Sequence, residues 1–364
     1  MHLVVNAWPL CVEPQSMPAF HLLELLEELK EVEPGLQITL IGPQPTQLDR
    51  PAGSEFISAD LPVGEWGRLR FEQRALPRLA GKNEGDVLLS LTDSAPLRSP
   101  MPVIALTVRD SASDSDGFLF RLRRAIGQAG LAGAAARWRW SDEPLSEGDS
   151  TTQVLPTVSP RFRATDPGDD REVRSELNLP LGYVLCLGAE LLDLPVLLAA
   201  WTWVDASVGD AYPLTFVGLS EAGRHYVGER STELNVRESV LVLEEVGFEQ
   251  LPAIYRGADA FLHPGYSLTG QELRWALATG VPIACAETPY ASSLLGEAAY
   301  LAPSDNTRSL GASCLTLLVE HQEVAKPLRE KGLMRAAEYH GQEPRSGLMR
   351  LIRSVINQTS NGRK

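Results

Sequence analysis

The loop over residues 265–270, which begins at Gly265 and ends at Gly270, has the residue types best suited to ligand chemistry. It follows the apolar run 260–264, which predicts a short buried strand, and it opens a helical pattern over 270–278. The first N–H groups of a helix lack partners within the helix, and the positive end of the helix dipole lies there. At the carboxyl end of a parallel strand, this arrangement binds phosphates. The sequence therefore predicts an anion-binding loop.

Alternating strand and helix patterns surround this loop. In the second half we expect strands over 183–188, 214–218, 240–246, 260–264 and 282–286, and helices over 195–204, 250–256, 270–278, 309–320, 323–339 and 344–357. In the first half we expect strands over 2–7, 36–41, 86–91, 102–107 and 154–156, and helices over 19–30, 69–79 and 118–136. Apolar strands that alternate with helices are typical of βαβ units. The predicted fold class is α/β, with two Rossmann-like domains that contain parallel sheets.

A polar, broken passage over 159–180 separates the two alternating patterns, and we interpret it as a linker together with the first helix of the second domain. We therefore expect an N-terminal domain over 1–160 and a second domain over 161–340. We expect the segment 341–364 to be a helix that packs back toward the first domain. A chain of 364 residues is long enough for two domains of ordinary size.

The composition argues against several classes of function. The net charge of −14 repels polyanions, so we expect no nucleic-acid partner. His21, His225, His321 and His340 are scattered without the spacing of metal ligands, so we expect no metal site. No apolar run approaches the roughly 20 residues that span a bilayer, and the N-terminal run reads as a strand rather than a signal peptide. Together with dispersed cysteines, this predicts a cytoplasmic protein.

Several phrases of the sequence resemble one family of enzymes. They are FVGLSEAGR, VLVLEEVGFEQLPAIYRGADAFLHPGYS, ALATGVPIACAETP and LAPSDN in the second half, and, more weakly, VVNAWPL and QVLPTVSPRF in the first. This chain is similar in them to the retaining nucleotide-sugar glycosyltransferases of family 4, which have the GT-B fold. The resemblance implies two domains that face each other across a cleft, with a sugar-nucleotide donor on the second domain and an acceptor on the first.

The residues with which this family holds its donor are replaced here. The resemblance aligns the family's two donor-binding glutamates with Ser267 and Trp275, and its diphosphate-binding Arg and Lys with Leu191 and Leu192. Asp193 follows directly. Two unit charges about 4 Å apart interact by roughly 4 kcal/mol at an effective dielectric constant of about 20. The loss of two cations and the gain of a carboxylate therefore disfavour an anionic donor.

Two further positions of the family pattern are altered. A glycine beside the nucleotide base is replaced by Glu244, which Glu245 follows. The family's histidine in the first domain is replaced by Arg109. A guanidinium pairs well with phosphate oxygens, so Arg109 is a candidate replacement contact, although a solvated arginine or one paired with Asp110 is the favoured interpretation.

Two functions remain open. The favoured one is a non-catalytic paralogue that acts with an active glycosyltransferase or as a homo-oligomer. The alternative is an active hexosyltransferase whose donor contacts are rebuilt from Arg109, Arg224, Arg256 or Arg274. A ligand sensor is a weaker third hypothesis. No cofactor is expected beyond a nucleotide-sugar donor, if the protein is active. The candidate cleft or donor-binding residues are Gly188, Gly218, Arg224, Glu244, Gly265, Ser267, Gly270 and Trp275.

Three other features could carry function. Trp275 could fill the donor site, because it stands where the family has a ribose-binding carboxylate. His263 could point into the cleft, but an ordinary histidine at a strand end is favoured. Arg121, Arg123 and Arg124 lie in a run with Phe118 that could contact an anionic membrane surface. A solvated helix face is the favoured interpretation, because the chain as a whole is acidic.

Overall fold

The computed structural model describes residues 1–45, 48–92, 94–106, 118–140, 151–165, 170–267, 269–340 and 342–362. The chain forms two compact units, which we call unit 1 and unit 2. Unit 1 comprises Met1–Pro14, Pro18–Thr157 and Gly341–Lys364, and unit 2 comprises Gln15–Met17 and Val158–His340. The C-terminal segment therefore belongs to unit 1.

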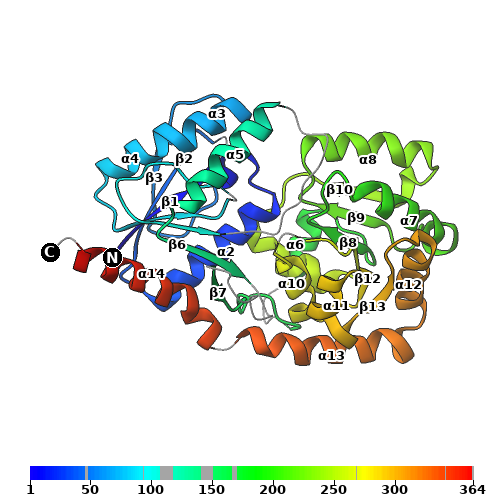
Figure 1. Ribbon diagram of the computed structural model, residues 1–364. Helices are drawn as coiled ribbons and strands as arrows, with labels where there is room; N and C mark the ends of the chain where they lie inside the picture. Colours follow the sequence, from blue (N-terminus) through cyan, green and yellow to red (C-terminus); the bar gives the residue numbers. More distant parts are fainter. Residues whose placement is uncertain are drawn as a thin grey trace. The chain divides into compact units, whose positions relative to one another are not determined.

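Unit 1 contains a seven-stranded sheet in which all pairings are parallel. Its strands are β1 (His2–Asn6), β2 (Gln37–Pro43), β3 (Glu55–Ala59), β4 (Val87–Ser90), β5 (Val103–Leu106), β6 (Ala136–Trp140) and β7 (Thr152–Val154). The order is β3-β2-β1-β4-β5-β6-β7, so the direction of winding reverses between β1 and β4. The central strands are almost wholly apolar because helices cover both faces of the sheet (Figure 1).

The helices of unit 1 bury their apolar sides against this sheet. They are α1 (Trp8–Val12), α2 (Met17–Val32), α3 (Glu65–Arg70), the π-helical turn η1 (Phe71–Ala75), α4 (Leu76–Lys82), α5 (Phe118–Ala132) and α14 (Gln342–Gly362). Leucines at helical spacing make α2 amphipathic, and its leucines are buried. On α14 the buried residues are Leu348, Met349, Ile352 and Val355, and the helix packs near β4 and β7.

Unit 2 contains a six-stranded, all-parallel sheet. Its strands are β8 (Val184–Leu187), β9 (Leu214–Val217), β10 (Val240–Leu243), β11 (Ala260–His263), β12 (Ile283–Glu287) and β13 (Tyr300–Pro303). The order β10-β9-β8-β11-β12-β13 repeats the winding of unit 1, and the reversal lies between β8 and β11. Each of the two units therefore has a Rossmann-like sheet, which confirms the predicted fold class.

The helices of unit 2 follow its strands in alternating order, but the helices over 221–233 and 289–295 and the strand β13 were not predicted. The helices are α6 (Asp170–Glu176), α7 (Leu194–Val208), α8 (Glu221–Glu233), α9 (Leu251–Gly257), α10 (Gln271–Thr279), α11 (Pro289–Leu295), α12 (Thr307–Val319) and α13 (Lys326–Ala336). Short helical turns are η2 (Arg237–Ser239), η3 (Phe248–Gln250), η4 (Gly296–Ala298), η5 (His321–Ala325) and η6 (Ala337–His340). Trp201 on α7 and Leu317 on α12 lie in one buried core with the strands.

Both π-helical turns, η1 and η5, lie just before a proline that continues a helix. Pro77 follows η1 and Pro327 follows η5, each as the second residue of the next α-helix. A proline has no N–H and its ring collides with the carbonyl one turn earlier. A wider π-turn relieves this conflict without breaking the helix. The two continuous helical segments therefore tolerate proline at the same relative position.

Several predicted boundaries in unit 1 are wrong. The helix predicted over 118–136 ends at Ala132, because Gly133 terminates it, and β6 follows. The strand predicted over 154–156 is β7, two residues earlier. The polar passage before residue 65 contains the edge strand β3, which was not predicted. Edge strands are short and only partly buried, so their apolar pattern is weak.

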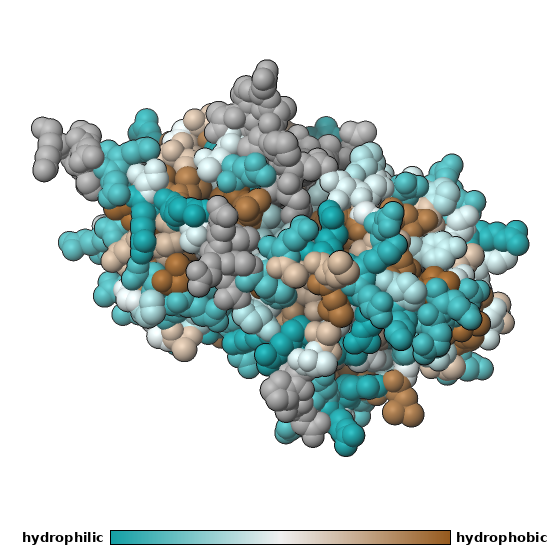
Figure 2. Space-filling model, turned by 90° about the horizontal axis from the view of Figure 1, so that it is seen from below, coloured by the Kyte–Doolittle hydropathy of each residue, from teal (hydrophilic) through white to brown (hydrophobic). Residues whose placement is uncertain are grey.

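Among the described residues, no helix combines the length and the apolar character needed to cross a membrane. On the face drawn in Figure 2, apolar residues form small groups between polar ones.

Candidate functional site

The predicted anion-binding loop lies where the winding of the unit 2 sheet reverses. Strands β8 and β11 are neighbours, and the chain leaves their carboxyl ends at Gly188 and Gly265. Both glycines have positive φ, +78° at Gly188 and +88° at Gly265, which L-residues rarely adopt. In open α/β sheets, ligands bind at this switch point, outside the carboxyl ends of the strands. We therefore call the residues around Gly188 and Gly265 the switch-point site.

Side chains of unit 2 hold the loop over residues 265–270 in place through hydrogen bonds. The hydroxyl of Ser267 accepts a hydrogen bond from the N–H of Gly270 (2.6 Å), just before α10 begins. Thr288 donates to the carbonyl of Gly265 (2.8 Å). Ser267 stands where the resemblance implies a donor-binding glutamate, and here it closes a turn of the loop instead.

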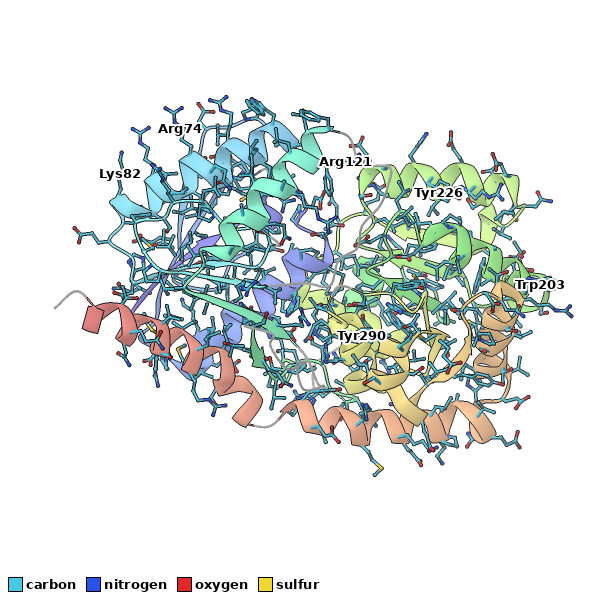
Figure 3. The ribbon with its side chains drawn as sticks, viewed as in Figure 1. Arg74, Lys82, Arg121, Trp203, Tyr226 and Tyr290 are labelled. Atoms are coloured by element: carbon cyan, nitrogen blue, oxygen red, sulfur yellow. The ribbon has the colours of Figure 1, made fainter. Side chains whose placement is uncertain are left out.

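Tyr290 holds the same loop from α11. Its hydroxyl donates to the carbonyl of Thr269 at 2.9 Å. Tyr290 is labelled in Figure 3. A Cβ atom at Gly270, where φ is +70°, would collide with this hydroxyl, and one at Gly265 would collide with the carbonyl of Ala286. Close packing within unit 2 thus accounts for both glycines.

A buried histidine and glutamate occupy the centre of the switch-point site. His263 ends β11, and its Nε2 lies 3.2 Å from Oε1 of Glu272 in the first turn of α10. Both side chains are almost completely buried. The N–H of Gly265 donates to Nδ1 of His263 (3.1 Å), which leaves Nε2 as the ring nitrogen that faces Glu272. Burial lowers the pKa of His263, whereas hydrogen bonds with Cys285 and Glu272 raise it by more.

Two more carboxylates lie beside Glu272, on the turn between β8 and α7. Asp193 accepts a hydrogen bond from the N–H of Glu190 (3.0 Å). Burial raises the pKa of Glu190, and the charges of Asp193 and Glu272 raise it further. Burial also raises the pKa of Asp193, and Glu272 adds to this effect, whereas the Glu190 N–H and His263 oppose it. The three carboxylates therefore form one acidic cluster at the switch-point site.

Apolar residues of the same turn replace the cations that the resemblance implies. Leu191 is 46% exposed and Leu192 is 66% exposed. Neither leucine fills the core, and neither can neutralise a phosphate. This turn presents exposed leucines next to the exposed Glu190 and the half-buried Asp193.

Three of the four arginines that are candidates to replace these cations already have partners. Arg256 forms two hydrogen bonds of 2.7 Å with the carboxylate of Asp170. Arg274 is fully buried and donates to the carbonyl of Thr269 (2.6 Å). Arg224 donates to the carbonyl of Leu219 (2.8 Å). Arg109 lies outside the described residues, and so does Asp110.

Trp275 is fully buried in an aromatic cluster of unit 2. Its ring stacks on Phe162, with centroids 4.6 Å apart and planes at 5°. Phe248 and Tyr255 complete the cluster at 6.0 and 6.3 Å from Trp275. Phe162 follows β7 along the chain and was not recognised in the sequence. At the position implied for a ribose-binding carboxylate, unit 2 therefore has a packed indole ring.

The remaining predicted residues lie at the same edge of the sheet. Gly218 follows β9 with φ +77°, and Glu244 and Glu245 are exposed after β10. These acids add negative charge to the edge where the strands end. Within the described part of the chain, no group of three histidine, cysteine or acidic side chains could hold a metal ion.

The switch point of unit 1 contains a polar network of its own. Asn6 ends β1 and donates to the hydroxyl of Ser90 (3.4 Å), which ends β4. Ser90 in turn bonds with Thr92 (2.9 Å) and donates to the carbonyl of Ser94 (3.1 Å). All four residues are buried. The network ties the two strand ends together.

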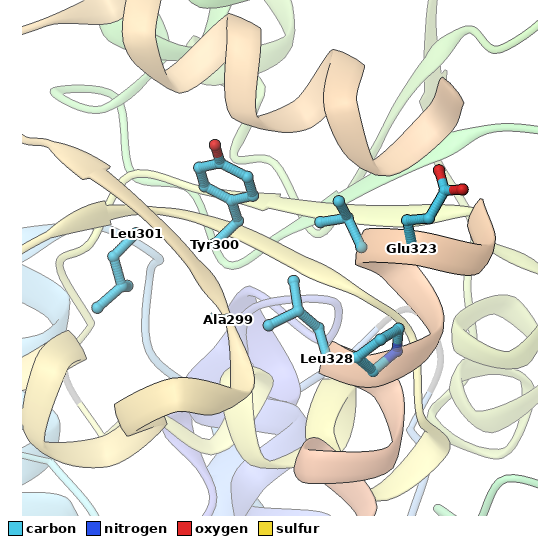
Figure 4. Close-up of a pocket in the computed structure, with 7 residues that line it drawn as sticks. Ala299, Tyr300, Leu301, Glu323 and Leu328 are labelled. Atoms are coloured by element: carbon cyan, nitrogen blue, oxygen red, sulfur yellow. The ribbon is translucent and has the colours of Figure 1, made fainter. Parts of the chain in front are cut away.

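An open groove of about 410 Å³ lies elsewhere on unit 2 (Figure 4). Its lining comes from the edge strand β13 with the residues before it, and from η5 and α13. The lining residues are Ala299, Tyr300, Leu301, Glu323, Val324, Pro327 and Leu328. Glu323 is the charged residue among them, so the groove does not suit an anionic ligand.

The fold is that of known glycosyltransferases. No family model matches the chain, and no curated protein is significantly similar to it in sequence. Solved structures are similar in fold. A sucrose-phosphate synthase from Thermosynechococcus elongatus superposes with a TM-score of 0.75 at 13% identity, over 98% of this chain and 100% of that one.

Two further structures agree with this one. WaaG, a glycosyltransferase involved in lipopolysaccharide biosynthesis, gives a TM-score of 0.70 at 14% identity, over 98% of this chain and 99% of that one. Anabaena Alr3699/HepE in complex with UDP and glucose gives 0.65 at 14% identity, over 99% and 98%. These neighbours have the GT-B fold, and the likeness confirms that fold for this chain. At such low identity, it shows the fold alone.

We expect Trp275→Ala to lower the free energy of unfolding by about 3–5 kcal/mol, because it removes a large buried ring from the aromatic cluster. Urea denaturation followed by circular dichroism measures the change. Trp203→Ala is the matched control, since Trp203 is 47% exposed on α7 and contacts Arg308, and it should cost under about 1 kcal/mol. Equal losses in the two variants would show that Trp275 is not a core residue.

We expect the double variant Glu190→Gln/Asp193→Asn to be more stable than the wild type at pH 7. The pKa values of both carboxyl groups are raised in the folded chain. The folded state therefore binds more protons than the unfolded state between the ordinary and the raised pKa values, and stability falls as pH rises through this window. The advantage of the variant should shrink as pH is lowered toward the ordinary carboxyl pKa. Thermal melting over a pH series tests this, and a constant advantage would contradict it.

Proposed function

We propose that this protein is a non-catalytic, glycosyltransferase-like protein that supports an active glycosyltransferase in the biosynthesis of a glycan or cell-surface polysaccharide, in the cytoplasm. The observation that carries the proposal is the acidic cluster of Glu190, Asp193 and Glu272 at the switch point of a GT-B donor domain. A nucleotide-sugar donor brings a diphosphate, and like charges in a partly buried site repel strongly.

The filled ribose position supports the same proposal. A ribose is bound through its hydroxyl groups, and a carboxylate readily accepts hydrogen bonds from them. Trp275 offers no such acceptor, and its ring is stacked on Phe162. The site has therefore lost its charge complementarity and the group that would bind the sugar of the nucleotide, while the sheet and its glycine turns are retained.

We expect UDP, GDP, ADP and their sugar derivatives to leave the melting temperature of the wild-type protein unchanged. A ligand present at 100 times its dissociation constant stabilises a protein by about 2.7 kcal/mol, so binding would be evident. Anabaena HepE, whose crystal structures contain UDP, is a suitable positive control. A clear shift for the wild-type chain would refute the proposal in favour of an active transferase with a divergent donor site.

A combined variant tests, in the same titration, whether the charge of the site or its shape prevents nucleotide binding. Leu191→Arg and Leu192→Lys place cations on two exposed positions, and Glu190→Gln with Asp193→Asn removes two acids. We expect the combined variant to fold, because none of these changes enters the core. If UDP stabilises it, repulsion alone excludes the diphosphate. If UDP has no effect, the indole of Trp275 also blocks the site.

A further inference from the structure

The sheet of unit 2 ends at β13, and one side of this edge strand is unpaired. β13 is the last strand in the order of the sheet, and it pairs with β12. Within the described part of the chain, no backbone hydrogen bond joins Tyr300, Leu301 or Ala302 to an element other than β12. An edge strand presents a row of N–H and C=O groups that a further strand can pair with. The free side of β13 therefore offers such a row.

β13 lacks most of the features that keep edge strands from pairing with other chains. Such features are charged residues, proline or a bulge on the edge, or a very short strand. Tyr300, Leu301 and Ala302 carry no charge, and Pro303 is the last residue of the strand. Tyr300 is 39% exposed, and Pro303 is also exposed. Among these features, β13 has a short length and a proline at its end, and its first three residues remain able to pair.

An apolar groove adjoins the same strand (Figure 4). It is the groove of about 410 Å³ that β13 and the segment formed by η5 and α13 line together. Val324 and Leu328 of that segment are four residues apart, so they lie on one side of it, next to Pro327. An extended segment beside β13 would place every second side chain on one face. It could therefore bury apolar side chains in the groove while its backbone pairs with the strand.

Glu323 adds a charge that an occupant of the groove must complement. It is the charged residue of the lining, and it is exposed. Its side chain has no ion pair or hydrogen bond with any described residue. A carboxylate beside an apolar groove attracts a basic side chain and repels an acidic one. The groove therefore favours an occupant that is apolar and carries a positive charge.

We propose that β13 binds an extended segment of a partner protein, which adds a seventh strand to the sheet of unit 2. The segment alternates apolar with polar residues and carries at least one lysine or arginine. In strand addition, main-chain hydrogen bonds give affinity and pockets for alternate side chains give specificity. A small apolar molecule would fill the groove but would leave the backbone groups of β13 unpaired. The inference does not involve the switch-point site, so it holds whether or not a nucleotide binds there.

A peptide selection on the full chain tests the proposal. The probe is a phage-displayed library of random peptides, and the enriched peptides are synthesised and titrated by fluorescence anisotropy. We expect enriched sequences that alternate apolar and polar residues and contain lysine or arginine. Tyr300→Ser, which removes an exposed ring from the groove lining, should weaken their binding. The proposal is overturned if no enriched peptide loses affinity for this variant.

An N-methyl scan of one selected peptide distinguishes strand addition from binding through side chains alone. Methylation of an N–H that faces β13 removes a main-chain hydrogen bond and should raise the dissociation constant roughly tenfold. Methylation of the intervening residues should have little effect, because their N–H groups point away from β13. An effect that does not alternate along the peptide would contradict strand addition.

A charge exchange tests the role of Glu323. Glu323→Lys should raise the dissociation constant of a basic peptide roughly fivefold. The same peptide with its lysine replaced by glutamate should bind this variant more tightly than it binds the wild type. Glu330→Lys is the matched control, because Glu330 is exposed on α13 and lies outside the lining. Equal losses in the two variants would refute a specific role for the groove.

Sedimentation velocity shows whether a second copy of this chain occupies the edge instead. We expect the wild type to form no dimer that depends on the groove. A dimer that Tyr300→Ser dissociates would show that β13 pairs with another copy, and it would overturn the proposal of a different partner protein.

Discussion

The contact between His263 and Glu272 fixes the chemistry of the switch-point site. It joins the end of β11 to the first turn of α10 and buries a carboxylate at the terminus of that helix. A negative charge is stabilised there by the helix dipole and the first N–H groups. In this chain, Glu272 receives that stabilisation. The side chain of Glu272 therefore places a negative charge at this helix terminus.

Glu190 and Asp193 extend this effect to the neighbouring turn. Their pKa values are raised because burial and repulsion from neighbouring carboxylates outweigh the opposing effect of His263 on Asp193. Further along α10, the ring of Trp275 stacks on Phe162 at the position where the resemblance implies a ribose-binding carboxylate. The acidic side chains and the packed Trp275 ring thus both disfavour nucleotide binding, and both lie in unit 2. This agreement favours a scaffold released from donor binding over a rearranged donor site.

The sequence predicted the fold class and the glycines at the strand ends, because both depend on local patterns. Buried parallel strands are continuous apolar runs, and glycines at their ends mark turns that need positive φ, as at Gly188 and Gly265. The contact between His263 and Glu272 was not predicted. It depends on the side-chain direction in the first turn of α10, which no periodic pattern specifies. Phe162 was missed because a lone aromatic residue after a strand has no periodic signal.

A crystal grown with a saturating nucleotide sugar tests the central claim most directly. The acidic cluster and the packed indole predict that the switch-point site holds no nucleotide, with Glu272 still bonded to His263. Electron density for a diphosphate over the loop between Gly265 and Gly270, with Glu272 displaced, would contradict the account.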